Sequence, residues 1–406
     1  MSELQNISHV YKGLLERNRA FAAFKDEELA IIYSDLSKYI CEKDSIFDPM
    51  SGYGGSMSFF GKKGFKTTNI ELNPPSYYWQ ILINPLNTPT IVNAVDKMIS
   101  RMQYLPKIKD SFSLIDNLFS DSAIIHINNL YDFILSNSNN NELISTALIL
   151  PFVSRFANYV KSSTNITHFK QGGFCSYIGW EIDLELYLNV LKNKLLKDYD
   201  LYIQREHYNI LADMQQVSLV EKYPYFVTSP PYPNYRDYSK LFKIENYVLD
   251  SIIMGESTDF NMMIGSNNVS GKTFGNIHSE KANKFLNELL EKAEKLKVKN
   301  KKSCSDIKTY YYPYFAQYFY NIQEAYNKLD TMLQNNVVGY IVVNDNITRD
   351  IIVPVGAAIC DTFNDLGYST EDFNISQISH YGNIGKNAKR INSLHTRHIL
   401  KVWKSK

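Results

Sequence analysis

A short apolar segment, SIFDP at residues 45–49, leads directly into the glycine turn SGYGG at residues 51–55. The segment KTTNIEL at residues 66–72 then has the pattern of a second strand. A strand, a glycine turn, a helix and another strand in this order are typical of α/β folds. The turn has neither the GK[ST] ending of a phosphate loop nor the G-x-G-x-x-G spacing of the dinucleotide fingerprint. It therefore predicts close approach of a ligand to the backbone without naming the ligand.

The same alternation of strands and helices returns in the second half of the chain. Strand patterns occur in YNILADM, YFVTSPPY, VVGYIVVND and HILKVWK, with helical patterns between the later ones. We therefore expect an α/β fold with a doubly wound, mostly parallel sheet, built from residues 1–84 and 205–406. Three basic side chains around the start of HILKVWK are expected on a surface turn rather than in catalysis: His395, Arg397 and His398.

Residues 85–204 separate the two halves of this pattern. Apolar residues recur every three or four positions in this stretch, for example in NELISTALILPFVSRFANYVKS. This period predicts a helical insertion, used for target recognition or for docking. Residues 255–306 are rich in Ser, Asn and Gly and then in charge, so we expect a mobile segment that ends in a solvated helix.

Composition excludes several classes of protein. The 43 Lys and Arg residues balance 42 Asp and Glu residues, so any hold on nucleic acid must come from local patches. The four cysteines form no CxxC pair, which argues against a zinc site and a disulfide framework and favours a reducing compartment. The sequence has no signal peptide and no apolar run of about 18 residues. We expect no metal, no membrane contact and a cytoplasmic location.

Two acidic residues stand at the ends of the first two strand patterns. Asp48 precedes the glycine turn, and Glu71 ends the next strand. An acid at the second position of an α/β unit is well placed to accept hydrogen bonds from ribose hydroxyls, which implies a cofactor that carries a nucleoside. A glycine turn near an unrelated acid is also common, so this region alone leaves a structural explanation open.

The segment Thr228-Ser229-Pro230-Pro231-Tyr232 has the strongest chemical signal. Two consecutive prolines restrict the backbone, so the Ser229 hydroxyl and the Pro230 carbonyl point in fixed directions. Together they make an acceptor pair for an amino group, and Tyr232 offers a face for a planar ring. The alternative is a proline-rich loop that merely ends a strand.

The motifs FDPMSGYGG, IELNPP, ADM and TSPPY resemble the cofactor and catalytic motifs of S-adenosylmethionine-dependent DNA amino-methyltransferases, over about residues 40–84 and 205–404. The resemblance implies a Rossmann-like class I methyltransferase fold with a seven-stranded sheet. It implies that Glu71 holds the ribose and that Asp213 lies beside the adenine of the cofactor. Met50 stands where the family usually has Phe, and the helical insertion replaces a recognisable target-recognition domain. The implied S-adenosylmethionine site comprises Asp48, Pro49, Met50, Gly52, Gly54, Glu71, Asp213 and Thr228, and the implied methyl-transfer site comprises Ser229, Pro230, Pro231 and Tyr232.

The resemblance also implies double-stranded DNA as substrate, with the target base flipped out of the duplex. In this family, Ser at the first position of the catalytic tetrapeptide, here Ser229-Pro230-Pro231-Tyr232, is associated with N4 of cytosine. The resemblance therefore implies cytosine N4 as the target, in a restriction-modification or phage-defence system. The alternatives are N6 of adenine, an amino group of RNA or tRNA, and a non-catalytic, cofactor-binding subunit of a defence complex. Cognate restriction or defence proteins are possible partners, and an oligomer is possible.

Overall fold

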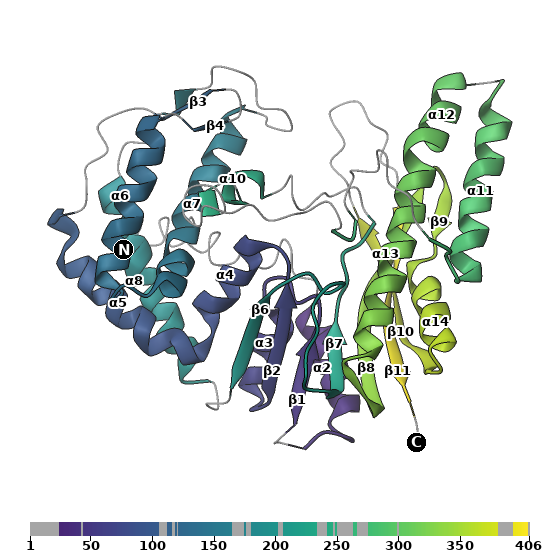
Figure 1. Ribbon diagram of the computed structural model, residues 1–406, viewed down its shortest axis with the longest axis horizontal. Helices are drawn as coiled ribbons and strands as arrows, with labels where there is room; N and C mark the ends of the chain where they lie inside the picture. Colours follow the sequence, from purple (N-terminus) through teal and green to yellow (C-terminus); the bar gives the residue numbers. More distant parts are fainter. Residues whose placement is uncertain are drawn as a thin grey trace.

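The protein is a mixed α/β structure with a central, mostly parallel sheet, as the computed structural model shows (Figure 1). Its helices lie on both sides of this sheet. The structure describes residues 24–41, 44–104, 112–115, 118–119, 121–164, 174–175, 180–201, 206–233, 242–246, 248–249, 263–265, 275–298, 300–380 and 393–404.

The central sheet has eight strands, against the seven expected from the sequence, because short β9 pairs with the end of β8 beside the main path. Along the main path the order is β10-β11-β8-β7-β1-β2-β6. From β6 to β8 all neighbours are parallel, whereas β11 runs antiparallel to both β8 and β10. The strands are β1 (Ser45–Asp48), β2 (Lys66–Glu71), β6 (His207–Leu211), β7 (Tyr223–Thr228), β8 (Leu333–Thr348), β9 (Ile351–Val353), β10 (Ser369–His380) and β11 (Ser393–Trp403).

The strand order reverses direction between β1 and β7. From β1 the chain adds β2 and β6 on one side, and then adds β7 and β8 on the other. In open α/β sheets, ligands bind outside the carboxyl ends of the strands at such a reversal. The fold therefore points to the ends of β1 and β7 as a binding site.

Helices cover both faces of the sheet because the strand residues alternate between two apolar clusters. Ile46 and Val227 pack on one face with α2 (Asp26–Leu36) and α3 (Gly55–Lys62). Their neighbours Phe47 and Phe226 pack on the opposite face. That face is covered by α11 (Glu280–Leu296), α13 (Tyr312–Asp330) and α14 (Val355–Asp365).

A block of helices lies to one side of the sheet in Figure 1 and has an apolar core of its own. The core includes α4, which directly follows β2, so it begins before the helical stretch expected at residue 85. None of the helices in the described ranges is long and apolar enough to cross a bilayer. The helices of the block are α4 (Pro74–Ile83), α5 (Thr88–Ser100), α6 (Asp121–Asn137), α7 (Glu142–Thr164) and α8 (Trp180–Tyr199), with a small sheet of β3 (Phe112–Ile115), β4 (Leu118–Phe119) and β5 (Phe174–Cys175).

The segment 255–306, expected to be mobile and then solvated, contains α11, which is amphipathic rather than solvated all round. Ser279 caps this helix by accepting a hydrogen bond from the backbone N–H of Ala282 at 3.1 Å. The side chains of Phe285 and Leu289 are buried in the sheet-facing cluster, so only the charged face of α11 is solvated. Residues 251–262 and 266–274 lie outside the described residues. Shorter helical segments are α10 (Lys243–Asn246), α12 (Lys301–Asp306), η2 (Pro85–Asn87), η3 (Met102–Tyr104) and η5 (Ile307–Tyr311).

The prediction of a surface turn around residues 395–398 is wrong. These residues lie within β11, between β8 and β10, and Arg397 and His398 are buried. The reason is electrostatic, because both side chains find acidic partners inside the fold. His398 Nδ1 lies 2.6 Å from Asp372 Oδ2, and Arg397 forms an ion pair with Glu28.

Candidate functional site

Four of the residues singled out in the sequence lie at the carboxyl ends of adjacent strands. Asp48 ends β1, Glu71 ends β2, Asp213 follows β6, and Ser229 follows β7. Because β6, β2, β1 and β7 are neighbours and parallel, these residues meet at one edge of the sheet. Thr228, the last residue of β7, is fully buried beside Asp48.

The glycine turn between β1 and α3 favours glycine at two positions because of its backbone conformation, and at one of them also because of limited space. Gly52 and Gly54 have φ angles of 53° and 77°, a left-handed conformation that disfavours other residues. A Cβ atom at Gly54 would also lie 3.0 Å from Cγ of Gln80, whereas one at Gly52 would meet no atom within 4 Å. Gly52 therefore faces open space, as a backbone that admits a ligand must. Pro49 is buried and Met50 packs against the core below.

Gln80 of α4 holds the glycine turn in place. Its Nε2 donates to Oγ of Ser51 at 2.8 Å and to the carbonyl of Gly52 at 2.5 Å. The backbone N–H and the hydroxyl of Ser51 both donate to the carbonyl of Ile70, each at 3.0 Å. The sequence analysis missed Gln80, although an amide side chain in the apolar second half of the helix PPSYYWQILI was a usable signal.

The carboxyl group of Asp48 is buried and carries a raised pKa. Burial raises the pKa of Asp48 to about 6, against hydrogen bonds from Ser56, Thr228 and the Met50 N–H that lower it. The Met50 N–H lies 3.2 Å from Asp48 Oδ1. This carboxyl therefore relies on dipoles for its stabilisation, and no Lys or Arg pairs with it among the described residues.

Glu71 is a second carboxyl group at this edge of the sheet, and among the described residues no Lys or Arg pairs with it. Burial raises its pKa to about 8, the backbone N–H groups of Asn73 and Gly52 lower it, and the nearby charge of Asp48 raises it further. The Asn73 N–H donates to Glu71 Oε1 at 2.8 Å. The interaction with Gly52 and Asp48 joins Glu71 to the glycine turn, so β1 and β2 contribute to one polar site.

Asp213 sits in a tight turn directly after β6. Its Oδ1 accepts the backbone N–H of Gln215 at 2.9 Å, and its carbonyl accepts the N–H groups of Gln216 and Val217 at 2.9 Å. The side chain is partly exposed. The turn thus fixes Asp213 at the same sheet edge as Glu71, one strand further out.

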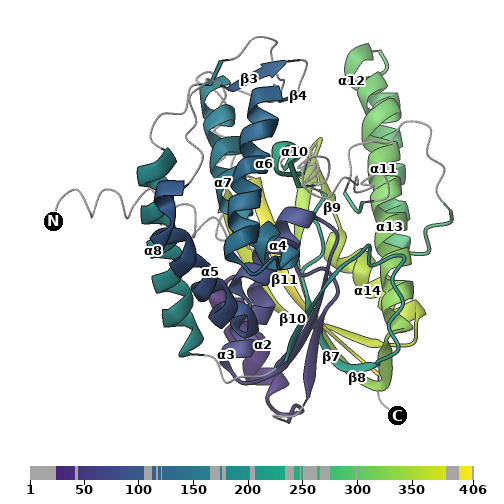
Figure 2. The same ribbon diagram turned by 60° about the vertical axis from the view of Figure 1, so that its left-hand side comes forward.

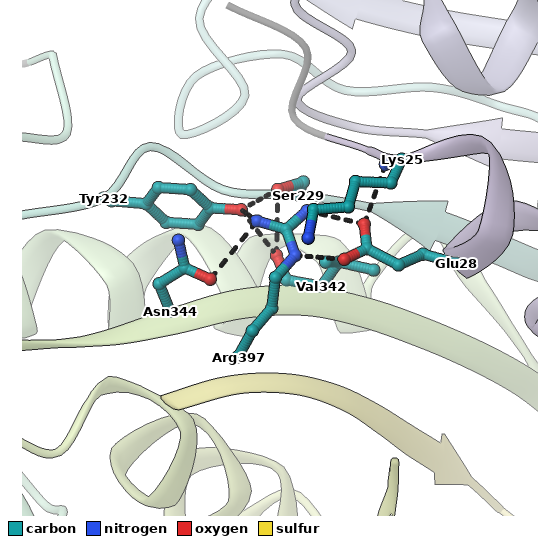
Figure 3. A network of polar contacts seen from close by, with 7 residues as sticks. All are labelled: Lys25, Glu28, Ser229, Tyr232, Val342, Asn344 and Arg397. Atoms are coloured by element: carbon teal, nitrogen blue, oxygen red, sulfur yellow. Dashed lines mark hydrogen bonds and ion pairs between the residues drawn. The ribbon is translucent and has the colours of Figure 1, made fainter. Parts of the chain in front are cut away.

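The catalytic tetrapeptide suggested by the sequence is tied to β8 through its two hydroxyl groups (Figure 3). Ser229 is buried, and its Oγ lies 2.8 Å from the carbonyl oxygen of Val342 and 2.7 Å from Oη of Tyr232. Tyr232 Oη lies 3.3 Å from the same carbonyl. Burial raises the pKa of the Tyr232 hydroxyl, while the nearby charge of Arg397 lowers it.

The backbone that follows Ser229 is anchored at two carbonyls. The hydroxyl of Tyr318, on α13, donates to the carbonyl of Pro231 at 3.1 Å, and Nδ2 of Asn346 donates to the carbonyl of Pro233 at 3.4 Å. Within the described part of the chain, no group donates to the carbonyl of Pro230. That carbonyl is therefore available as an acceptor next to Ser229.

Arg397 of β11 and Glu28 of α2 complete the surroundings of the tetrapeptide. The sequence analysis placed Arg397 on a surface turn and did not single out Glu28. Arg397 Nη1 lies 3.4 Å from Tyr232 Oη and 3.2 Å from Oδ1 of Asn344. The signal was the spacing of opposite charges. Glu28 and Asp35 are seven apart on a helix, and Arg397 and Lys401 are four apart on a strand, so each pair shares one face.

We compared the chain with protein-family models, with curated proteins and with solved structures, and none of the three comparisons found a match. The function of the site must therefore follow from its own geometry and chemistry.

Proposed function

We propose that the protein transfers a methyl group from S-adenosylmethionine to the exocyclic amine of a base in double-stranded DNA, with N4 of cytosine as the expected target. The observation that carries the proposal is the hydrogen bonding of Ser229, whose hydroxyl hydrogen is already used inside the protein. A substrate group that meets Ser229 Oγ must then be a hydrogen-bond donor.

The direction of the hydrogen bonds follows from the inventory of donors and acceptors. A carbonyl oxygen can only accept, so the hydroxyl closest to the Val342 carbonyl, that of Ser229 at 2.8 Å, donates to it. Tyr232 then donates to Ser229 Oγ across 2.7 Å. Ser229 Oγ keeps one lone pair and no hydrogen for a substrate.

This arrangement matches an amino group better than a carbonyl or a ring nitrogen. Ser229 Oγ and the Pro230 carbonyl would accept the two N–H groups of an exocyclic amine. An amine conjugated to a base is a poor nucleophile, and two fixed acceptors would draw its nitrogen towards tetrahedral geometry, with its lone pair out of the ring plane. The amine nitrogen would form the new N–C bond as the methyl–sulfur bond breaks, the electron pair of that bond would stay on the sulfur, and one amine proton would leave to solvent.

The glycine turn and its two acids fit S-adenosylmethionine. The open side of Gly52 leaves room beside the backbone, and Asp48 and Glu71 are carboxyl groups without a cation among the described residues. When bound, the cofactor supplies a methyl group on a positively charged sulfur. Glu71 would accept the ribose hydroxyls, Asp213 would lie beside the adenine, and Asp48, Gly52 and Gly54 would line the methionine part. The switch point between β1 and β7 supports the Rossmann-like class I fold that the resemblance implies.

Duplex DNA as substrate requires the target base to leave the stack. Tyr232 is partly exposed and fixed through its hydroxyl, so its ring is the proposed stacking face for the extruded base. Helices α6 and α7 on one side and α11 to α13 on the other extend beyond the strands in both views (Figures 1 and 2). These two flanks are the proposed supports for the duplex.

The decisive experiment is radiolabelled methyl transfer to duplex DNA and to tRNA, followed by mass spectrometry of the nucleosides. Ser229→Ala removes one preorganised acceptor, so turnover should fall about 10²- to 10³-fold, or about 3 to 4 kcal/mol, while cofactor affinity stays unchanged. The expected product is N4-methylcytosine. N6-methyladenine would keep the mechanism and change the base. 5-methylcytosine would refute the mechanism, because its formation needs a cysteine nucleophile that the tetrapeptide lacks.

A further inference from the structure

Arg397 stands between two groups that are far apart in the sequence. Its Nε and Nη2 face the carboxylate of Glu28, with Nη2 2.6 Å from Oε2. Its Nη1 reaches Tyr232 Oη and Asn344 Oδ1 (Figure 3). Glu28 is itself held at the start of α2, where its Oε2 accepts the backbone N–H of Lys25 at 2.8 Å. One guanidinium therefore joins α2, β8, β11 and the loop after β7.

We propose that Arg397, held by Glu28, is a positioning residue that sets the orientation of the Tyr232 and Ser229 hydroxyls. The proposal rests on the proposed methyl transfer at Ser229. A guanidinium has donors and no acceptor, so its approach to Tyr232 Oη occupies an oxygen lone pair and excludes a hydrogen from that side. The Tyr232 hydrogen is then free to point to Ser229 Oγ, and the Ser229 hydrogen to the Val342 carbonyl.

The planar shape of arginine is what this position requires. Two nitrogens on one edge of the guanidinium bind the two oxygens of Glu28, which fixes the plane of the group. The third nitrogen is then aimed at Tyr232 without freedom to rotate. A lysine at position 397 would keep the charge but would not hold two partners in a fixed geometry.

A second ion pair on the same interface provides a matched control. Lys401 of β11 pairs with Asp35 of α2, and Asp35 Oδ2 also accepts the hydroxyl of Tyr340 at 2.5 Å. Arg397 and Lys401 are 6% and 8% exposed, and Glu28 and Asp35 are 7% and 4% exposed. The two pairs join the same two elements at equal depth, but only the first touches Tyr232.

The test compares E28Q/R397M with D35N/K401M, each of which replaces one buried ion pair by neutral side chains and should keep the fold. Methyl transfer, cofactor affinity by calorimetry and hydrogen exchange of the Ser229 and Tyr232 amides are measured in both. E28Q/R397M should lower kcat about 10- to 100-fold with cofactor Kd and the KM for DNA unchanged, and should speed exchange at these two amides. D35N/K401M should change kcat less than about twofold. If E28Q/R397M does not fold, Arg397→Lys takes its place with the same expected split between kcat and KM.

Tyr232→Phe, combined with E28Q/R397M, completes a double-mutant cycle. If Arg397 acts through the Tyr232 hydroxyl, E28Q/R397M should cause no further loss of kcat in the Tyr232→Phe background. Additive losses, or equal losses from the two ion-pair variants, would overturn the positioning role. If the wild-type protein transfers no methyl group, the proposed function fails, while the difference in hydrogen exchange still decides whether Arg397 holds the loop.

Discussion

Buried acids occur in two regions of this protein and meet opposite surroundings. Between α2 and β11, burial would raise the pKa of Asp35, but hydrogen bonds from Lys38, Lys401 and Tyr340 outweigh burial and lower it to about 2. At the ends of β1 and β2, burial dominates, and the pKa values of Asp48 and Glu71 rise to about 6 and about 8. The first acid is paired with two cations, the exposed Lys38 and the buried Lys401, and the other two rely on dipoles alone.

The difference separates a structural use of charge from a binding use. A buried acid that is fully paired contributes to holding two elements in one arrangement and has little left to offer a ligand. The ionised form of a buried acid without a cation destabilises the fold until a ligand provides a hydrogen-bond donor or a positive charge. The comparison therefore supports the ends of β1 and β2 as the proposed ligand site.

Breaking the paired region should give the largest effect. Lys401→Met removes the buried cation of Asp35 and leaves only the exposed Lys38 beside it, so the free energy of unfolding at pH 7 should fall by about 3 to 5 kcal/mol. Urea unfolding measures this loss. Adding Asp35→Asn should restore most of the stability, because no buried charge remains. A loss below about 1 kcal/mol in the single variant would show that solvent already compensates Asp35.

Removing a charge from the unpaired region should have the opposite sign. The raised pKa of Glu71, about 8 against an ordinary 4.5, keeps its proton on the folded protein across this range, so the free energy of unfolding falls as the pH rises from about 4.5 to about 8. Glu71→Gln should therefore stabilise the ligand-free protein at pH 9 by about 1 to 3 kcal/mol, a range reduced for partial exposure, and by nothing at pH 4. Urea unfolding at both values tests this. Glu27→Gln, at an exposed acid of α2, is the control that should change neither.

The smallest effect concerns ligand affinity as a function of pH. If ribose hydroxyls donate to ionised Glu71, adenosine should bind more tightly as the pH rises. Its Kd should decrease about tenfold for each pH unit up to about pH 8 and stay constant above that pH. Adenosine is the suitable probe because it has the ribose but no amino-acid part that titrates in this range. Calorimetry should show this slope in the wild type and a flat profile in Glu71→Gln. A flat wild-type profile would remove Glu71 from the ribose site.

Much of the sheet could be predicted because β1, β2, β6 and β7 are short segments bounded by turns, and because β8 contains the β-branched run VVGYIVV. The pattern placed β1, β2, β6 and β7 close to their observed bounds, whereas β8 and β11 begin four and five residues before the segments VVGYIVVND and HILKVWK. It missed β10, an edge strand whose sequence STEDFNISQISH has few apolar residues, since an edge strand has less surface to bury. It also gave no sign of β9, which exists only because β8 continues past the sheet edge.

Site residues could be predicted where they directly end or follow a strand. Residues that belong to the site through tertiary contacts could not be assigned to it. Asp48, Glu71 and Ser229 could be singled out because each directly ends or follows a strand. Gln80 and Arg397 left only weak local signals, and their partners could not be predicted because packing sets them. Arg397 and Glu28 are 369 residues apart, and no local pattern joins them.

The same long separation has a consequence for how the protein matures during synthesis. The glycine turn, β1 and β2 come early in the chain, so the part of the site that would hold a ligand can form as soon as its own strands pair. The loop at Tyr232 receives its contact from Arg397 only after 165 further residues have been made and β11 has entered the sheet between β8 and β10. A nascent chain would thus gain the capacity to bind well before the capacity to react, and a chain that stops short of β11 would bind without reacting.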